Sequence, residues 1–303
     1  MEQKVIQFMR LRTFATVLSV LMIVGSLGTL AVKGINWGLD FTGGTLIELV
    51  YDKPADTSAI RDQLAAEGFS DSVVQEYGSV SDVLVRIPGD DPALGNKIAS
   101  VLDQKHDGSI EVKRVEFVGP QVGERLREQG GLGMLMALGL VMLYIAFRFQ
   151  FKFSVGAVLA LAHDSIIVLG LFSLFQLQFD LTVLAAILAV IGYSLNDTII
   201  VYDRVRENFR KLRKGEPDEI INVSLTQTLG RTLATSGTTL MVLISLFLFG
   251  GEMINGFATA LIVGVGVGTY SSIYIASNIL LYMKISREDL IIPVKEDLED
   301  ETP

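Results

Sequence analysis

Six apolar segments, each about 20 residues long, divide the chain, and that is the length of helix that crosses a bilayer. Leucine, isoleucine, valine, alanine, glycine and phenylalanine follow one another in these segments with few interrupting charges. We therefore predict six transmembrane helices, at residues 13–32, 131–147, 153–175, 181–202, 231–249 and 256–283. The segment 203–230, between the fourth and fifth helices, is predicted to be a basic loop.

The long polar segment, residues 33–129, has a different pattern. Val83, Val85 and Ile87 recur at every second position, as in a strand that buries one face. We predict strands at 44–51, 73–77, 82–87 and 110–118, and helices at 57–67 and 92–104. This βαββαβ order predicts a ferredoxin-like α+β domain inserted after the first helix. It contains no nucleophile–base pair and no phosphate loop, which favours a binding or mechanical module.

Composition agrees with a membrane protein. Hydrophobic residues make up 50% of the chain, charged residues 19%, and the mean hydropathy is +0.46. The sequence has no cysteine, which excludes disulfides, thiolate catalysis and cysteine-ligated metals. It has two histidines, which excludes a histidine-rich metal site. We predict no cofactor and no metal.

The distribution of charge predicts the orientation. Basic residues flank the first helix on its N-terminal side, join the second to the third, and follow the fourth. The short loops around Asp180 and Glu252 contain none. The positive-inside rule then places residues 1–12 and the acidic tail 284–303 in the cytoplasm and residues 33–129 in the periplasm. The first helix is interpreted as an uncleaved anchor. The net charge of −9, with acids in excess in the polar domain, argues against nucleic acid as a partner.

Asp197 is the most informative polar residue, because it interrupts the apolar segment 181–202. A carboxylate in lipid costs several kcal/mol, so such residues usually face the bundle interior and serve a function there. Proton coupling, ion coupling and a structural ion pair all remain open. Arg231 starts the fifth segment at a comparable depth, so we expect it to pair with Asp197 and form a proton switch. The alternative for Arg231 is an interfacial side chain that snorkels to the headgroups.

Other polar residues and two glycine motifs complete the candidate set. Asn196 precedes Asp197, and the pair His163-Asp164 lies near the middle of the third segment. Two glycine-bearing stretches frame the polar domain and are interpreted as hinges, because glycine gives the backbone extra freedom. Their candidate residues are Gly38, Asp40, Gly43 and Gly44 on the first side and Gly119 on the second.

Four motifs together resemble one family. GLDFTGG after the first helix, AHDSIIVLG in the third, GYSLNDTIIVYDRVREN in the fourth and RTLATSGTTL in the fifth are similar to the SecF family of the bacterial protein translocase, within the RND superfamily. The resemblance covers essentially the whole chain. It implies the six-helix half of an RND-type bundle that assembles with SecD, works with the SecYEG channel, with YajC and YidC as further partners, and uses the proton-motive force to promote preprotein export across the inner membrane.

The resemblance also implies roles for individual residues. Asp197 and Arg231 match the family's proton-pathway residues, and Asn196, Asp164 and His163 fall on its motifs. Asp164 is expected to supply polar continuity or a second site. For His163 and Asp164, core ion pairing or helix contact is the alternative to proton handling.

Two other functions stay open at this stage. One is half of a proton-coupled RND exporter of small molecules or lipids, which would need a pocket with basic or aromatic lining in the outer domain. The other is a passive scaffold in which Asp197 and Arg231 only hold helices together. An enzyme is not predicted, because no Ser–His or metal-ligand set lies at one depth in the membrane.

Overall fold

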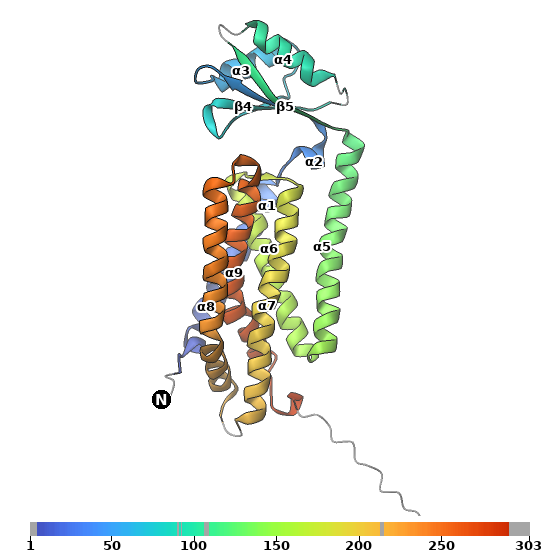
Figure 1. The fold of residues 1–303 in the computed structure, drawn as a ribbon. Coiled ribbons are helices and arrows are strands. Elements are labelled where there is room, and N and C mark those ends of the chain that lie inside the picture. The colour runs from blue at the N-terminus through green and yellow to red at the C-terminus, as the bar shows by residue number, and fades with distance from the viewer. Residues whose placement is uncertain (1–4, 90, 92, 106–108, 213–214, 291–303) are drawn as a thin grey trace, which may run out of the picture.

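The structure, a computed structural model, describes residues 5–89, 91, 93–105, 109–212 and 215–290. Long helices form a bundle, and a small α+β domain lies beyond one end of it (Figure 1). Within these described residues, six helices are long and apolar enough to cross a membrane. They are α1 (Arg12–Lys33), α5 (Pro120–Arg148), α6 (Phe151–Phe175), α7 (Leu181–Lys211), α8 (Pro217–Phe249) and α9 (Glu252–Tyr282). The short 3-10 helices Phe8–Leu11 and Glu288–Leu290 flank the bundle near its two termini.

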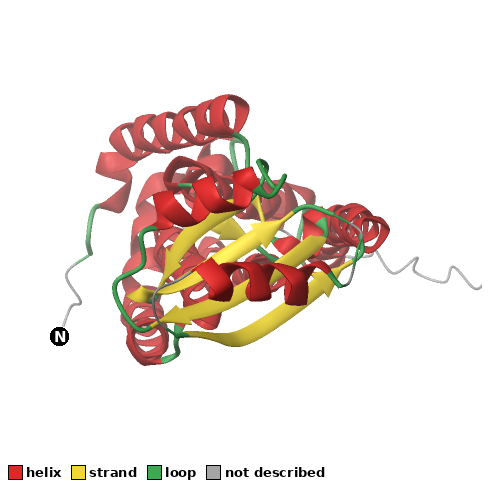
Figure 2. Cartoon of the chain, turned by 90° about the horizontal axis from the view of Figure 1, so that it is seen from above, coloured by secondary structure: helices red, strands yellow, loops and turns green. Residues whose placement is uncertain are grey.

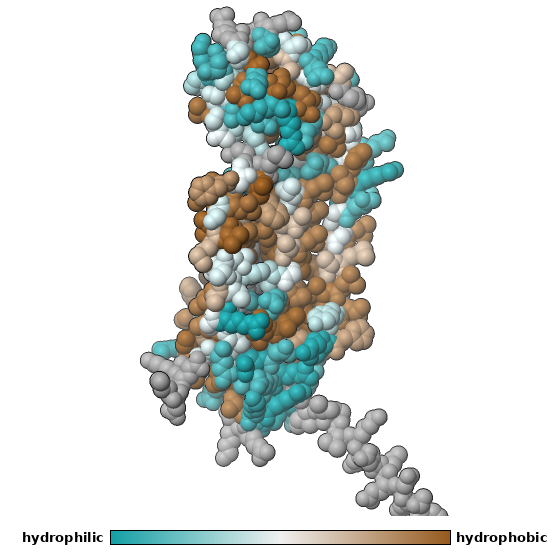
Figure 3. Space-filling model, viewed as in Figure 1, coloured by the Kyte–Doolittle hydropathy of each residue, from teal (hydrophilic) through white to brown (hydrophobic). Residues whose placement is uncertain are grey.

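On the face of the molecule seen in Figure 3, apolar side chains form a belt over the bundle between two more polar ends. Large side chains in this belt are exposed, among them Phe14 at 68%, Phe147 at 85% and Leu248 at 63%. Such an area of exposed apolar surface is stable only against lipid or a partner. The chain is therefore a multi-pass membrane protein.

The helices extend beyond the apolar segments, and this corrects the prediction of a loop at 203–230. α7 continues to Lys211 and α8 begins at Pro217. Glu207 accepts hydrogen bonds from Arg204 and Lys211 on the same helix, and Glu216 and Glu219 form a capping box that starts α8. Hydropathy marks the part of a helix that crosses lipid, whereas the helix itself ends where its caps are.

The polar domain has the predicted order of elements. They are β2 (Gly44–Tyr51), α3 (Thr57–Ala66), β3 (Val73–Tyr77), β4 (Ser79–Ile87), α4 (Leu94–Lys105) and β5 (Ile110–Val118). The strands form one antiparallel sheet in the order β3-β4-β2-β5. Both helices cover the same face of this sheet (Figure 2). The core between sheet and helices contains Ile47, Leu49, Val83, Val85, Ile60, Leu64, Ile98 and Leu102, with exposures of 4% or less.

A short parallel ladder joins the base of the domain to the bundle. β1 (Asn36–Trp37) pairs with β6 (Gln178–Phe179) in the loop between α6 and α7. The Trp37 ring packs against Phe41 of α2 (Leu39–Thr42) at 5.4 Å and against Phe179 at 5.5 Å between centroids. Arg86 of β4 donates to the carbonyl oxygen of Trp37 at 2.9 Å. The sheet, the motif after α1 and the start of α7 are therefore connected.

Three of the four glycines in the predicted hinge motifs, Gly43, Gly44 and Gly119, lie in different surroundings. Gly43 and Gly44 have φ angles of 69° and 113°, and a Cβ atom would lie 2.6 Å from Pro120 Cα at the first and 2.5 Å from Ile87 O at the second. Gly119, the N-cap of α5, has a φ of −63°, and a Cβ atom added there would lie 4.0 Å from its nearest neighbour, Val122 Cγ2. In this conformation Gly43 and Gly44 are required by close packing and a left-handed backbone.

We expect Gly44→Ala to lower the free energy of unfolding by more than ~1 kcal/mol, because alanine meets both an unfavourable φ and a backbone oxygen. Gly119→Ala is the matched control and should unfold like the parent protein. Thermal unfolding of the purified protein in detergent measures both. Equal melting temperatures for the two variants would show that the Gly44 backbone adapts without cost.

Candidate functional site

Asp197 of α7 lies at the contact of three helices. Its side chain is 1% exposed, and its Oδ2 atom is 3.5 Å from the hydroxyl of Ser236 on α8. Ser236 also contacts the hydroxyl of Thr269 on α9 at 2.8 Å and accepts a hydrogen bond from Tyr193 at 3.3 Å. The Oδ1 atom of Asp197 has no hydrogen-bond partner among the described residues. Asp197 is thus a buried carboxylate with one long hydrogen bond and one free oxygen.

No direct ion pair joins Asp197 to Arg231 in the described part of the chain, although Arg231 is close enough to interact with the carboxylate electrostatically. The direct contact expected from the sequence is therefore not formed in this structure. Among the described residues, no carboxylate oxygen lies within 4.0 Å of the Arg231 guanidinium. Arg231 lies five residues before Ser236 on α8, about 7.5 Å along the helix axis and on another face. Its side chain is exposed and lines a cavity of 230 Å³ between α7 and α8. The charged residues that share this cavity are Asp203, Arg204 and Glu207.

A row of hydroxyl groups on α8 continues from Asp197 toward this cavity. Ser236, Thr232, Thr228 and Ser224 recur every four residues and are all buried. The Thr232 hydroxyl has no partner in the described part of the chain, and that of Ser224 accepts from Asn208 of α7 at 2.9 Å. The α7–α8 contact is therefore polar over several turns, as expected for a hydrated path or for hydrogen-bonded helix packing.

Asp164 of α6 is a second buried carboxylate, with different surroundings. Its Oδ1 atom lies 2.9 Å from Nδ1 of His163, and its Oδ2 atom accepts from Ser194 at 2.6 Å and Ser271 at 2.8 Å. The serines come from α7 and α9. All four side chains are at most 3% exposed. Three donors thus surround Asp164, whereas a single hydroxyl contacts Asp197.

Asn196 does not join either cluster. Its side chain is exposed on the outer face of α7, about 100° around the helix from Asp197. Thr269 and Ser271 could not be recognised as site residues from the sequence, because the small residues of the sixth segment are typical of helix packing. Their separation by two residues places them toward two different neighbours, which no periodicity in one helix reveals.

The motif after α1 contacts the N-terminal end of α7. The Asp40 carboxylate accepts from the backbone N–H of Leu181 at 3.0 Å, and the backbone N–H of Gly38 donates to Phe179 O at 2.7 Å. Asp180 caps α7 by accepting from the N–H of Val183 at 2.9 Å. Carboxylates at a helix N-terminus satisfy free N–H groups and interact favourably with the helix dipole. The motif therefore positions the helix that carries Asp197.

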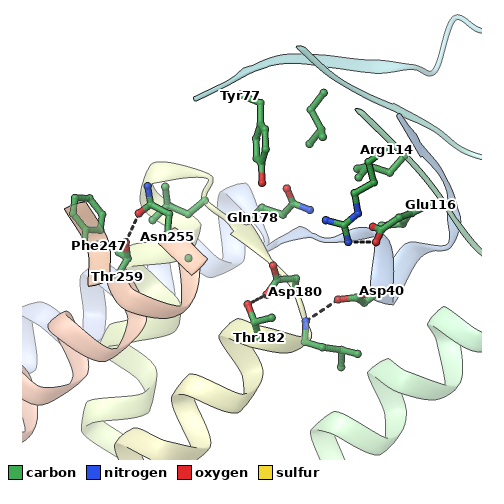
Figure 4. A pocket seen from close by; sticks show the side chains of 16 residues that line it. Asp40, Tyr77, Arg114, Glu116, Gln178, Asp180, Thr182, Phe247, Asn255 and Thr259 are labelled. Carbon is green, nitrogen blue, oxygen red and sulfur yellow. Dashed lines mark hydrogen bonds and ion pairs between the residues drawn. The ribbon is translucent and has the colours of Figure 1, made fainter. Parts of the chain in front are cut away.

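A cavity of 810 Å³ separates the sheet from the helix ends beneath it. Tyr77 and the ion pair of Arg114 with Glu116 line it on the sheet side (Figure 4). Asp40, Gln178, Asp180, Thr182, Phe247, Asn255 and Thr259 line it on the bundle side. No three His, Asp or Glu side chains among the described residues lie close enough together to hold a metal ion.

The sequence matches two family models. "Protein export membrane protein SecD/SecF, C-terminal" covers residues 97–286, and "SecD/SecF GG Motif" covers residues 28–55. The chain belongs to the SecD/SecF family. The protein translocase subunit SecF of Pseudomonas aeruginosa is 56% identical over 299 residues, which cover 98% of each chain. SecF of Vibrio alginolyticus is 54% identical over 308 residues, which cover 99% of this chain and 98% of the relative.

The solved structures of SecDF have the same fold. The crystal structure of SecDF from Thermus thermophilus, a translocon-associated membrane protein, matches with a TM-score of 0.86 and 36% identity over 93% of this chain. The chain spans 39% of that longer SecDF chain. SecDF in its super-membrane-facing form matches over the same share of each chain with a TM-score of 0.70. The family therefore includes more than one arrangement of this fold.

Arg231 offers a graded test of its contribution. Lysine keeps the positive charge but lacks the planar guanidinium group that can bind a carboxylate through two hydrogen bonds. Arg231→Lys should therefore retain part of the gradient-driven export, and Arg231→Ala, which also removes the charge, should lose nearly all of it. Export into membrane vesicles under an imposed proton gradient measures both. Full activity of the alanine variant would show that Arg231 is an interfacial side chain without a role in coupling.

Proposed function

We propose that this chain is a SecF subunit that, together with SecD, uses protons moving down their gradient to promote preprotein export. The observation that carries the proposal is Asp197: a carboxylate that is 1% exposed, inside a membrane helix, with one oxygen unpartnered among the described residues. An ionised carboxylate there is costly, and proton uptake removes that cost without displacing an existing strong partner.

Protonation of Asp197 would change its contact with α8. The ionised carboxylate can only accept a hydrogen bond, from Ser236, whereas the protonated acid can also donate one. Ser236 then has to rearrange its contacts with Thr269 and Tyr193. The exposed Arg231, in the charged cavity on the side of the basic loops, would attract the carboxylate once the proton has left.

The proposal also assigns the orientation and the outer domain. The basic residues at the end of α7 and at the connection of α5 to α6 favour the cytoplasm for that end of the bundle. The domain would then be periplasmic, and its βαββαβ order with the strand order β3-β4-β2-β5 supports a ferredoxin-like fold. The SecYEG channel, YajC, YidC and the preprotein are proposed as partners on the family resemblance.

One alternative has an observation in its favour. The 810 Å³ cavity is large enough for a small molecule and contains Tyr77 and Arg114, as an exporter of small molecules or lipids would require. Its other charged residues are the acids Asp40, Glu116 and Asp180, which disfavour anionic substrates. Co-purification with SecD and SecYEG separates a translocase subunit from an exporter.

Asp197→Asn tests the central role. Asparagine keeps the size and most hydrogen bonding of aspartate but cannot carry the proton, so the variant should assemble with SecD normally. We expect export driven by an imposed proton gradient to fall by about tenfold or more, the usual loss when a group that transfers protons is removed. Asp197→Glu, which keeps the titrating group, is the matched control. Wild-type export by Asp197→Asn would rule out proton coupling at this residue.

A second experiment tests whether the outer domain moves. The chain has no native cysteine, so cysteines introduced at Tyr77 and Asn255, on opposite sides of the cavity, can be joined by a cleavable cross-linker without competition. We expect the link to block late preprotein release and its cleavage to restore release, because a moving domain has to separate from the helix ends.

The control for this experiment is the same pair of cysteines, each modified separately, which should export normally. Unchanged export with the cross-link demonstrably formed would show that the domain works without this movement, and would leave the assignment of Asp197 intact.

A further inference from the structure

Of the two carboxylates buried in the bundle, Asp164 has the fuller set of hydrogen-bond donors. His163 Nδ1 at 2.9 Å, Ser194 Oγ at 2.6 Å and Ser271 Oγ at 2.8 Å all point to it. A buried carboxylate is stable when donors of this kind satisfy both of its oxygens. Asp197, with one contact at 3.5 Å, lacks such a set. The two acids are therefore suited to different tasks.

The donors of Asp164 connect three helices close to Asp197. Ser194 lies three residues before Asp197 on α7, about 4.5 Å along the axis. Ser271 lies two residues after Thr269, which belongs to the Asp197 cluster on α9. The hydrogen bonds of Asp164 thus hold α7 and α9 to α6 within about one turn of the Asp197 cluster. A change in these bonds would displace the groups around Asp197.

Close packing between α7 and α9 also joins these two helices firmly. A Cβ atom on Gly264 would lie 2.1 Å from Val190 Cγ2, and one on Gly268 would lie 3.0 Å from Ser194 Cβ. Where a side chain of the neighbouring helix occupies the space above a glycine, the two helices lie close together and in one fixed register. α6, α7 and α9 consequently form one tightly joined unit.

α8 is attached to this unit differently at the level of Asp197. Ser236 reaches Asp197, Thr269 and Tyr193 through hydroxyl contacts of 3.5, 2.8 and 3.3 Å. Its outward face is open, with Leu233 54% and Val242 66% exposed. Proton uptake by Asp197 would alter its contact with Ser236 directly, so α8 is the helix that a change in protonation would affect first.

We propose that Asp164 is a positioning residue whose carboxylate holds α6, α7 and α9 as one unit, against which α8 shifts when Asp197 gains or loses a proton. The proposal rests on the proposed role of Asp197 as the proton carrier. Asp164 itself keeps its three donors throughout the cycle, and His163 is one of them.

The test replaces the hydrogen bonds of Asp164 by a covalent link between the same helices. An ideal Cβ on Gly264 lies 3.0 Å from Val190 Cβ, slightly closer than the 3.5–4.5 Å usual in disulfides, so a small outward shift allows a bond between cysteines at these positions. The pair Val190→Cys/Gly264→Cys is placed in the wild-type chain and in Asp164→Asn, each in complex with SecD. Gradient-driven export is measured with the pair reduced and oxidised, at equal amounts of complex.

We expect Asp164→Asn with the pair reduced to export about tenfold less than the wild type, since a small misplacement of a reacting group produces such a loss. Oxidation should restore most of this export, and it should leave the wild-type chain within about twofold of its reduced value. Ser271→Ala should lower export about as much as Asp164→Asn does. Ser271→Thr keeps the hydroxyl group and should therefore export at close to the wild-type level.

Three results would overturn the proposal. Oxidation that blocks export in the wild-type chain would show that α7 and α9 move against each other. A formed disulfide that fails to rescue Asp164→Asn would show that the charge or a proton of Asp164 is itself required. Failure of the pair to cross-link in the wild type would contradict the register. Gradient-driven export at the wild-type level in Asp197→Asn would instead refute the proposed role of Asp197 and leave the helix contacts of Asp164 as a separate finding.

Discussion

The cost of keeping a carboxylate away from water inside a membrane helix organises this structure. Asp197 is 1% exposed and has one oxygen without a partner in the described part of the chain. A buried carboxylate is stable in a membrane helix only where neighbouring helices supply polar groups. Here the neighbouring helices supply hydroxyl groups rather than a positive charge. Hydroxyl groups donate or accept with little rearrangement, which allows the carboxylate to exist with or without a proton.

Asp164 shows how the same bundle surrounds a carboxylate whose hydrogen bonds are satisfied. The same residue type, in the same bundle, is surrounded by three donors at 2.6–2.9 Å. A protein that needed two structural acids would be expected to satisfy both, because an unsatisfied buried polar atom is destabilising. The incomplete environment of Asp197 is therefore consistent with a functional rather than a structural acid.

α7 provides the physical route from Asp197 to the outer domain. Its first turn is held by Asp180 and by the Asp40 carboxylate of the motif after α1. The preceding β1–β6 ladder and the hydrogen bond from Arg86 to Trp37 continue this connection to the sheet. The second route is α5, which begins at Pro120 directly after β5 and runs to Arg148 without interruption. A shift within the bundle thus has two continuous elements through which to reach the domain.

The sequence by itself determined the membrane class, the six crossing helices and the βαββαβ order, and it singled out Asp197 as an acid inside an apolar segment. These features depend on composition, on the period of the apolar residues and on the cost of one buried charge, all of which are local properties. The C-terminal end of α7 and the start of α8 were not predictable from hydropathy, because helices held by caps and side-chain pairs continue past the apolar segment.

Only the tertiary structure decided which groups meet. Arg231 and Ser236 lie on one helix, five residues apart, yet Ser236 faces Asp197 and Arg231 lines the cavity between α7 and α8. Ser194 and Ser271 meet at Asp164 although they are far apart in sequence. Such pairings follow from the rotation and register of whole helices, which the packing of Gly264 and Gly268 against α7 sets. No pattern within one segment contains that information.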